Sequence, residues 1–255
     1  KSNFTLYVGM RYKAVVEYEG TSFIGWQRQH GVVGKSVQES IERSIKEFCQ
    51  QSVIVYAAGR TDAGVHAVGQ VVHFDLKVSR EDYVIKNALN HYLRNEKVSI
   101  LQLERVDEEF HARFSAKKRH YTYKIANREA PLCIDLMRMW HVPKKLNVEN
   151  MREAASHIVG RHDFASFRAK DCQSKSSIKT VDSIDIIAAE EEININISAQ
   201  SFLHKQVRIT VGTFVECGMG LYPPAHVLEI LEKKDRAAAG ITAPAHGLYL
   251  TRVDY

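Results

Sequence analysis

The segment from Ala58 to Ala67, which reads Ala-Gly-Arg-Thr-Asp-Ala-Gly-Val-His-Ala, constrains the fold of this chain more than any other. An apolar run at residues 53–57 leads into it, and a second run at residues 70–74 follows it. Both runs are predicted to be strands, so the segment between them is a loop that joins two strands. Gly59 and Gly64 bound this loop, and glycine lets a backbone turn sharply and approach a flat ligand closely.

Arg60 and Asp62 stand close together within this loop. The simplest interpretation is an exposed ion pair in a turn, which contributes about 0–1 kcal/mol to stability. A carboxylate held between two strands, with a guanidinium beside it, is also suited to act as a nucleophile or a general base. The residue pattern alone leaves both interpretations open.

The composition is that of an ordinary globular protein. A chain of 255 residues suits one large domain or two small ones, and 45% of its residues are apolar. Lys and Arg number 35 against 30 for Asp and Glu, and this mild excess does not by itself indicate a nucleic-acid partner. Basic residues cluster at 117–120, 168–179 and 204–208, where a binding surface and a solvated face are both plausible.

The cysteines argue against a metal centre. Cys49, Cys133, Cys172 and Cys217 are scattered, and none has a second Cys or a His at a zinc-ligand spacing. Neither a metal site nor a disulfide framework is therefore expected, and a cytoplasmic location fits. No apolar run approaches the ~20 residues that span a membrane, and no secretory signal pattern opens the chain. Residues 1–9 precede the first strong pattern, and we expect them to be an added remnant or an extension outside the fold.

Strand and helix patterns alternate in two similar halves. Strands are predicted at residues 12–18, 53–57, 70–74, 98–103, 121–125 and 193–197. Helices are predicted to begin at Ser36, where Glu39 completes a capping box, at Ser79, at Asn147 and at Pro224, and Gly160 is expected to end the third of them. A polar stretch at residues 107–109 separates the halves. We therefore expect an α+β fold with an N-terminal half at residues 10–108, which carries the loop, and a C-terminal half at residues 109–255. The two sheets are expected to meet side by side and to leave a central cleft for a ligand.

Further motifs recur in order along most of the chain from Met10 onward. They are Gly25-Trp26-Gln27-Arg28-Gln29, Ser36-Val37-Gln38-Glu39, Phe-His-Ala-Arg-Phe-Ser-Ala at 110–116, Arg-His-Tyr-Thr-Tyr at 119–123, His-Asp-Phe at 162–164, Ser-Phe-Arg at 166–168, Phe-Leu-His at 202–204, Val207-Arg208 and Gly-Leu-Tyr-Leu at 247–250. Together with the Asp62 loop, these motifs resemble the pattern of the TruA-type tRNA pseudouridine synthases.

The resemblance implies a role for each matching residue. The catalytic aspartate of the family falls on Asp62, and its uracil-stacking tyrosine falls on Tyr121. The arginine that pairs with the catalytic carboxylate falls on Arg208, and the arginine that helps to displace the target base falls on Arg60. Further substrate contacts are expected at Leu248, His66 and Arg113.

The resemblance also implies a substrate, a fold and an assembly. The substrate is the anticodon stem-loop of tRNA, at uridines in RNA positions 38, 39 and 40. The fold is the pseudouridine-synthase fold, in which two α/β plait halves share a joined, mostly antiparallel sheet with a central cleft. The enzyme acts as a homodimer and needs neither a metal nor an organic cofactor.

Pseudouridine formation requires residues of these types. The enzyme must hold a detached uracil, and stacking of a base on an aromatic ring such as that of Tyr121 contributes about 1–3 kcal/mol. It must also keep Asp62 ionised, whereas burial alone raises a carboxyl pKa above about 3.9. A guanidinium such as that of Arg208 opposes that effect. The sequence does not distinguish covalent attack by Asp62 from removal of a ribose proton.

Some positions depart from the family pattern, and other functions stay open. Arg94 follows Leu93 where a proline is usual, and Lys205-Gln206 stands where a methionine is common, so local packing and RNA contacts are in doubt there. One alternative is an inactive tRNA-binding protein or RNA chaperone of the same fold. Another is a synthase with other RNA targets. A glycosidase would need a second carboxylate about 5–10 Å from the first, and the loop supplies none.

Overall fold

The computed structural model describes residues 9–29 and 31–255, so the predicted extension at residues 1–9 lies, apart from Gly9, outside the described residues. The chain divides into two compact units. The first runs to Ala116 and includes Tyr255, and the second spans residues 117–254. The predicted boundary follows residue 108, whereas the observed division follows Ala116. The segment between these two boundaries, residues 109–116, belongs to the first unit. The hydroxyl of Tyr255, which is also part of that unit, donates a hydrogen bond to the main-chain carbonyl of Ala112 at 2.7 Å.

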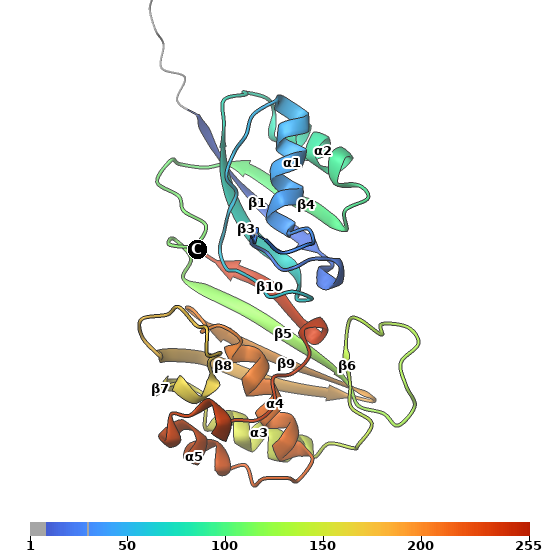
Figure 1. Cartoon of the computed structure of the whole chain (residues 1–255), viewed down its shortest axis with the longest axis vertical. Coiled ribbons are helices and arrows are strands. Elements are labelled where there is room, and N and C mark those ends of the chain that lie inside the picture. The colour runs from blue at the N-terminus through green and yellow to red at the C-terminus, as the bar shows by residue number, and fades with distance from the viewer. Residues whose placement is uncertain (1–8, 30) are drawn as a thin grey trace, which may run out of the picture. The chain divides into compact units, whose positions relative to one another are not determined.

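The first unit is built on an antiparallel sheet. Strand β1 (Met10–Tyr18) lies between β4 (Val98–Arg105) and β3 (His66–Leu76), and the short strand β2 (Tyr56–Ala57) pairs with β3. Side chains alternate along β1, so Tyr12, Ala14, Val16 and Tyr18 are buried on one face. Two helices, α1 (Val37–Cys49) and α2 (Asp82–Leu93), pack against one another beside these strands (Figure 1).

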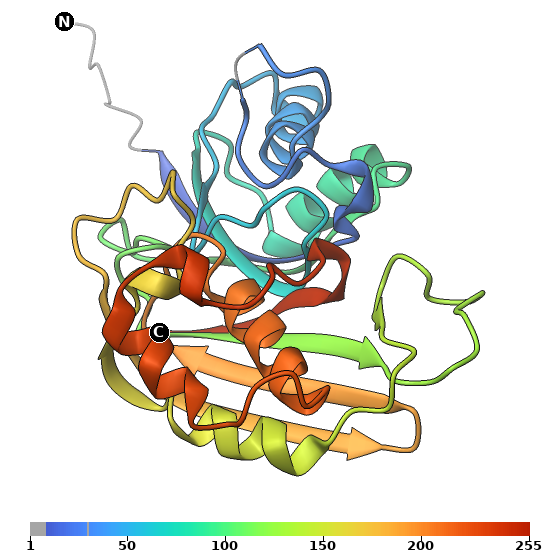
Figure 2. The same ribbon diagram turned by 60° about the horizontal axis from the view of Figure 1, so that its bottom comes forward.

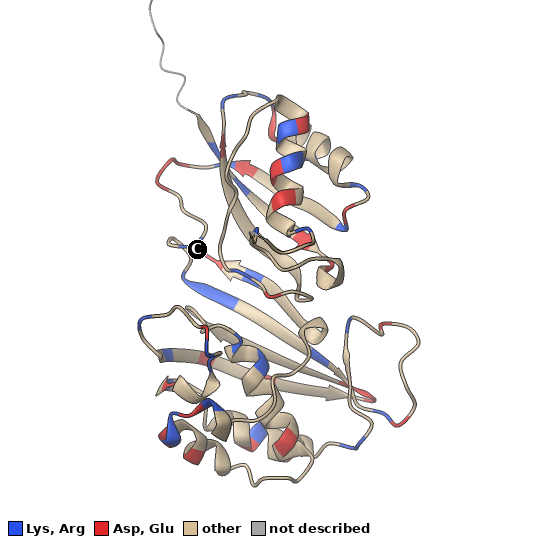
Figure 3. Cartoon of the chain, viewed as in Figure 1, with Lys and Arg blue, Asp and Glu red and all other residues tan. Residues whose placement is uncertain are grey.

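Helix α1 begins as its sequence predicts. The side-chain oxygen of Ser36 accepts a hydrogen bond from the Glu39 N–H at 3.2 Å, and the Glu39 carboxylate accepts one from the Ser36 N–H at 2.9 Å. This reciprocal pair satisfies two main-chain donors at the helix N-terminus, and the predicted capping box is confirmed. Figure 3 shows that charges of both signs cover the outer face of α1, while the opposite face carries buried Val37, Ile41 and Ile45.

The second unit is also built mainly on antiparallel strands. Their order is β10 (Leu248–Asp254), β5 (Lys118–Ala126), β9 (Glu192–Ala199), β8 (Ile178–Ala189) and β7 (Gly160–Asp163), each antiparallel to its neighbour. The two-residue strand β6 (Trp140–His141) pairs in parallel with the end of β5. Both units are therefore α+β with mostly antiparallel sheets, and the predicted fold class is confirmed.

Three helices accompany the second sheet, and Figure 2 shows them on one side of its strands. They are α3 (Val148–Ser156), α4 (Gln206–Gly218) and α5 (His226–Lys233). Asn147 caps α3 as predicted, because its side-chain oxygen accepts from the Asn150 N–H at 3.1 Å. Helix α4 packs against α3 and is buried almost all round, which is typical of a helix in the middle of a core. Among the described residues, none of these helices has the length and apolar character needed to cross a membrane.

Three local predictions are wrong in their boundaries. The run at residues 53–57 forms only the two-residue strand β2, because Ile54 is 60% exposed and the stretch before Tyr56 does not pair. Helix α2 starts at Asp82 rather than after Ser79, and its cap position, Glu81, makes no side-chain capping bond. Helix α3 ends at Ser156, before Gly160, which begins β7.

Candidate active site

The main chain on both sides of Asp62 is fixed by a contact with a distant glycine segment. Asp62 forms an isolated antiparallel bridge with Gly25, and the N–H of Trp26 donates to the carbonyl oxygen of Thr61 at 3.0 Å. Gly25 has φ of +115°, and a Cβ there would lie 2.9 Å from the Thr61 oxygen. A side chain at position 25 would therefore push the loop away. This pairing positions the backbone of Asp62 without help from its side chain.

A tight turn follows Asp62 immediately. The N–H of Val65 donates to the carbonyl of Asp62 at 3.1 Å, and Gly64, the third residue of the turn, has φ of +81°. A type II turn requires a positive φ at this position, which glycine adopts without strain. Gly64 therefore lets the chain turn directly after Asp62, and Asp62 is the first residue of this turn.

A buried polar network contacts the Asp62 loop at Thr61 and Gly59. The hydroxyls of Tyr18 and Thr61 hydrogen bond at 2.8 Å, and the Gln70 amide donates to the Gly59 carbonyl at 2.7 Å. Burial raises the pKa of Tyr18 to about 12, and its hydrogen bonds with Thr61 and Gln70 act against this effect. Tyr18 thus stays neutral at physiological pH, and the network holds the loop without placing a second charge beside Asp62.

The predicted site residues of the first unit differ in exposure. Asp62 is half-buried, and Arg60 and Arg113 are exposed. His66 is only 2% exposed, and its Nδ1 accepts a hydrogen bond from the Gly20 N–H at 2.9 Å. This hydrogen bond connects β3, the strand after the Asp62 loop, to the turn after β1. The sequence does not reveal this structural role. Whether His66 also contacts substrate stays a prediction.

In the second unit, strand β5 presents two tyrosines on one face. Tyr121 is half-buried, and its ring meets that of Phe202 edge-on with centroids 5.4 Å apart. Tyr123 is fully buried, its hydroxyl donates to the Pro244 carbonyl at 2.7 Å, and Leu248 lies opposite it on β10. Only Tyr121 therefore keeps part of its ring accessible, as a stacking residue must.

Arg208 projects from the first turns of α4 and is fastened to the chain before β10. Its Nε donates to the Ala243 carbonyl at 2.8 Å, and the Ala243 N–H donates to the Arg208 carbonyl at 3.1 Å. Burial lowers the pKa of His246, and the charge of Arg208 lowers it further. Burial also raises the pKa of Tyr123 well above its ordinary value, an effect that the Arg208 charge opposes. Arg208 is thus a positive charge near the buried Tyr123 and the half-buried His246, both of which are neutral at physiological pH.

Each unit gathers its own share of the predicted residues. The first brings Arg60 and Asp62 onto one loop whose next strand starts with His66, and places Arg113 in the segment before Ala116. The second brings Tyr121, Leu248 and Arg208 around Tyr123, as the paired strands and the charge effect show. Sequence reasoning missed Gly25 and Tyr18 as supports of the loop, because they lie near it only through the fold.

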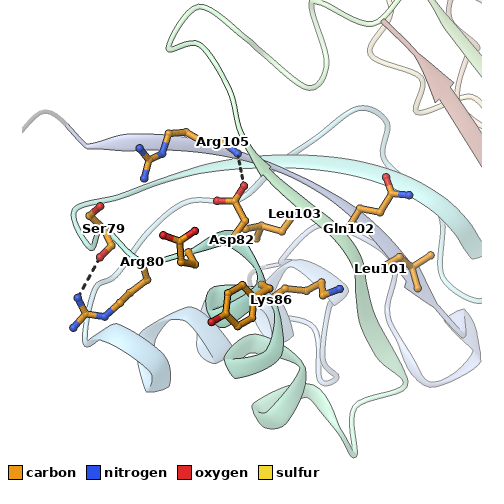
Figure 4. A pocket seen from close by; sticks show the side chains of 10 residues that line it. Ser79, Arg80, Asp82, Lys86, Leu101, Gln102, Leu103 and Arg105 are labelled. Carbon is orange, nitrogen blue, oxygen red and sulfur yellow. Dashed lines mark hydrogen bonds between the residues drawn. The ribbon is translucent and has the colours of Figure 1, made fainter.

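An open cavity of about 860 Å³ lies elsewhere in the first unit, between the start of α2 and strand β4 (Figure 4). Charges of both signs line it, and the Asp82 carboxylate accepts from the Arg105 N–H at 3.3 Å. None of the predicted site residues lines this cavity. Volume alone therefore does not locate the candidate active site. Among residues 9–29 and 31–255, no three His, Cys, Asp or Glu side chains group as metal ligands would.

Comparisons with known proteins agree with the geometry. A family model described as tRNA pseudouridine synthase matches residues 14–115 and 154–255. A protein named tRNA pseudouridine synthase A from Anaplasma phagocytophilum (strain HZ) is 98% identical over 246 residues, which cover 96% of this chain and 100% of that protein. A protein of the same name from Anaplasma marginale (strain Florida) is 70% identical, and one from Ehrlichia ruminantium (strain Welgevonden) is 56% identical, with 96% of this chain and all of each relative covered.

The matched residues include the Asp62 loop, α4 and β10, whereas strand β5 lies in the unmatched interval at residues 116–153. Asp62 and Arg208 thus both lie within the family match. Together with identities of 56% to 98% over nearly the whole chain, this match assigns the family. The chain belongs to the family of tRNA pseudouridine synthase A enzymes, which are isomerases.

Proposed function

We propose that this enzyme isomerises uridine to pseudouridine at positions 38, 39 and 40 of the tRNA anticodon stem-loop, with Asp62 as the catalytic carboxylate. The observation that carries the proposal is the Asp62 loop in a chain of this family. Its main chain is clamped by Gly25 and Trp26, and its turn is closed by Gly64. Such restraint suits a side chain that must meet a substrate in one fixed position.

The reaction rearranges bonds within one nucleotide. The N1–C1′ bond of uridine breaks, the uracil turns, and a C5–C1′ bond forms while the C5 proton leaves to solvent and N1 takes up a proton. No oxidant, reductant or second substrate is consumed. Asp62 assists by attacking the sugar or by removing a ribose proton, and both roles require its ionised form.

The second unit supplies groups for the detached base and for the carboxylate. The half-buried ring of Tyr121 is oriented by Phe202 and offers a face on which uracil stacks. Arg208 keeps its charge at any physiological pH and is oriented by its Nε bond to Ala243. In the proposed mechanism, the remaining guanidinium donors of Arg208 pair with the ionised Asp62 and stabilise it.

Arg60 suits the step that exposes the target. A uridine within a stem is flipped out of the base stack at a cost of a few kcal/mol, and a side chain that takes its place offsets part of that cost. Arg60 is exposed and stands at the start of the clamped loop, so its long side chain extends from a fixed backbone. We also propose, from the family resemblance, that the enzyme acts as a homodimer, which light scattering on the purified protein tests.

The decisive experiment measures tritium release from tRNA labelled at uridine C5. The wild type should release tritium, and Asp62→Asn should release none while it binds tRNA within a few-fold of the wild type. Asp135→Asn is the matched control, because Asp135 is an exposed carboxylate at φ +61°, a conformation that asparagine also tolerates. It should leave the rate unchanged.

Each contrary outcome has a definite meaning. A well-folded wild type that binds tRNA and releases no tritium is a binding protein or chaperone. Release of free uracil indicates a hydrolase. Release from other RNAs, but not from the anticodon stem-loop, identifies a synthase with other targets. A large loss of folding or affinity in Asp62→Asn assigns Asp62 a structural role.

A further inference from the structure

Four rings form a connected series on one face of the sheet in the first unit. His73 on β3 lies beside Lys13 on β1, so it faces away from the buried side chains of Tyr12 and Ala14. Three ring pairs make up the series: Tyr56 and His73 at 5.0 Å, His73 and His111 at 4.5 Å, and His111 and Phe114 at 4.3 Å between centroids.

The series is solvent-exposed at both ends and buried in its middle. The exposed fraction is 46% for Tyr56 and 76% for Phe114, whereas His73 is buried. The guanidinium carbon of Arg113 lies 5.7 Å from the centre of the Phe114 ring. Arg113 therefore places a cation against an exposed aromatic face, an arrangement that favours the binding of a further π-system or an anion beside it.

Hydrogen bonds hold the segment that carries Phe114 in place. The N–H of Ala112 donates to His73 Nδ1 at 3.1 Å, and the N–H of Arg113 donates to His111 Nδ1 at 3.1 Å. Arg11, already paired with Asp75 at 2.8 Å, donates to the Phe110 carbonyl at 3.0 Å. The backbone that carries Phe114 is therefore fixed, so little conformational entropy is lost when its ring contacts a ligand.

The imidazoles in the series behave as neutral rings. Burial lowers the pKa of His73 to about 4, and the neighbouring His111 and Arg11 lower it as well, while Asp75 opposes the shift. Burial and the charges of Arg11 and Arg113 lower the pKa of His111. Neutral imidazole stacks on an aromatic ring and leaves the positive charge at this surface to Arg113.

The series lies near the Asp62 loop. Tyr56 pairs with His73, and β2 runs from Tyr56 directly into the loop, which Gln70 holds by its bond to Gly59.

We propose that Phe114, backed by His111 and flanked by Arg113, is a stacking platform for an unpaired base of the tRNA close to the target uridine. The inference rests on the proposed function, since it takes the same RNA as the ligand. The aromatic face binds the base, and the guanidinium contacts the base or its phosphate. Arg113, Ser115 and Lys117, which are exposed and close to Phe114 in the sequence, add polar and cationic groups that suit RNA better than an apolar protein surface.

The test measures binding, not turnover. An anticodon stem-loop with 2-aminopurine beside the target position is titrated into the Asp62→Asn enzyme, and into the same enzyme with Phe114 changed. Stacking quenches the fluorescence of 2-aminopurine. Phe114→Ala should raise the Kd about 5- to 100-fold and abolish the quenching. Phe114→Trp should retain both, and Phe114→Leu should lose the quenching although it keeps an apolar side chain.

Tyr83→Ala is the matched control, because Tyr83 on α2 is an aromatic residue that is 64% exposed and lies outside the ring series. It should change neither the Kd nor the quenching. Circular dichroism and light scattering on each variant report folding and mass. An unchanged Kd for Phe114→Ala, or wild-type quenching by Phe114→Leu, overturns the platform.

A fall in mass for Phe114→Ala also overturns the platform, because it assigns the ring to an interface with a second copy. The two proposals fail separately. If tritium release is absent but Phe114→Ala still weakens binding, the platform stands and the isomerase assignment falls. If release is present and Phe114→Ala binds like its parent, the isomerase stands and the platform falls.

Discussion

The N–H of Trp26 donates to the carbonyl of Thr61 at 3.0 Å, so a residue remote in sequence fixes the backbone that carries Asp62. Trp26 is itself buried and packs against Tyr18 with ring centroids 6.1 Å apart. Trp26 is therefore a packing residue. The Gly25-Trp26 motif acts through the position of the loop that carries Asp62.

Gly25→Ala should displace this loop. The new Cβ would lie 2.9 Å from the Thr61 oxygen at φ +115°, and the resulting strain costs about 1–3 kcal/mol. We expect a lower thermal unfolding midpoint and a loss of kcat of at least about tenfold. Gly31→Ala is the control, since Gly31 also has a positive φ of +77° but has no atoms within 4 Å of a new Cβ. Equal losses of kcat in both variants would contradict a specific role for the contact with Thr61.

Arg208→Lys should reduce the rate more than the affinity for tRNA. A lysine keeps the charge but cannot donate to the Ala243 carbonyl and at the same time grip a carboxylate with two further bonds. We expect kcat to fall about 10- to 100-fold with the Kd changed less than about threefold. Arg252→Lys, on an exposed residue that pairs with Asp254, should leave both unchanged. Equal losses of rate and affinity in Arg208→Lys would make Arg208 a phosphate contact.

Acid should destabilise the protein through His73. The folded state holds the pKa of His73 at about 4, below its ordinary value of 6.5, so between these pH values the unfolded chain binds a proton that the folded chain does not. The free energy of unfolding therefore decreases as the pH is lowered through this window, by about 1–2 kcal/mol from this residue. The free energy of unfolding regains this contribution in full above pH 6.5.

His73→Asn removes this titration and keeps an acceptor for the Ala112 N–H. Thermal unfolding from pH 7 to pH 4 should therefore show a shallower decline for the variant than for the wild type. His111, whose pKa is also lowered, contributes in the same direction and remains in both proteins. Parallel declines in the two proteins would exclude His73 as a source of the acid sensitivity.

Binding of tRNA should weaken as salt increases. Each phosphate that a Lys or Arg neutralises releases counterions, so four such contacts predict an affinity loss of about 100-fold between about 50 and 200 mM salt. Figure 3 shows a run of cationic residues at the start of β5, which includes Lys118 and Arg119. Fluorescence titration of the Asp62→Asn enzyme measures the slope. An affinity that does not change with salt would exclude an electrostatic surface for RNA.

Elements with a clear one-sided pattern were predictable from the sequence. The capping box of Ser36 and Glu39 and the alternation at residues 193–197 each mark a structure with one buried face. Strand β8 was not predicted, because most of its side chains are exposed and no apolar alternation marks it. Helix α4 is apolar nearly all round, so it lacks the periodicity that identifies a surface helix.

The candidate site was predictable only in part for a related reason. Asp62, Tyr121 and Arg208 could be located because each of them lies in a short motif of neighbouring residues. Their supports act through tertiary contacts: Tyr18 on Thr61, and Ala243 on Arg208. No local pattern reports a partner that is 43 or 35 residues away along the chain.

The turn after Asp62 also offers a practical opportunity. Ala63 is exposed, and the bonds that shape the turn come from the main chain of its neighbours and from the positive φ of Gly64. A cysteine at position 63, in a chain whose exposed Cys133 is replaced by serine, would carry a spectroscopic label beside the Asp62 carboxylate with the loop undisturbed. The arrival and departure of tRNA would then be followed in real time from within the site itself.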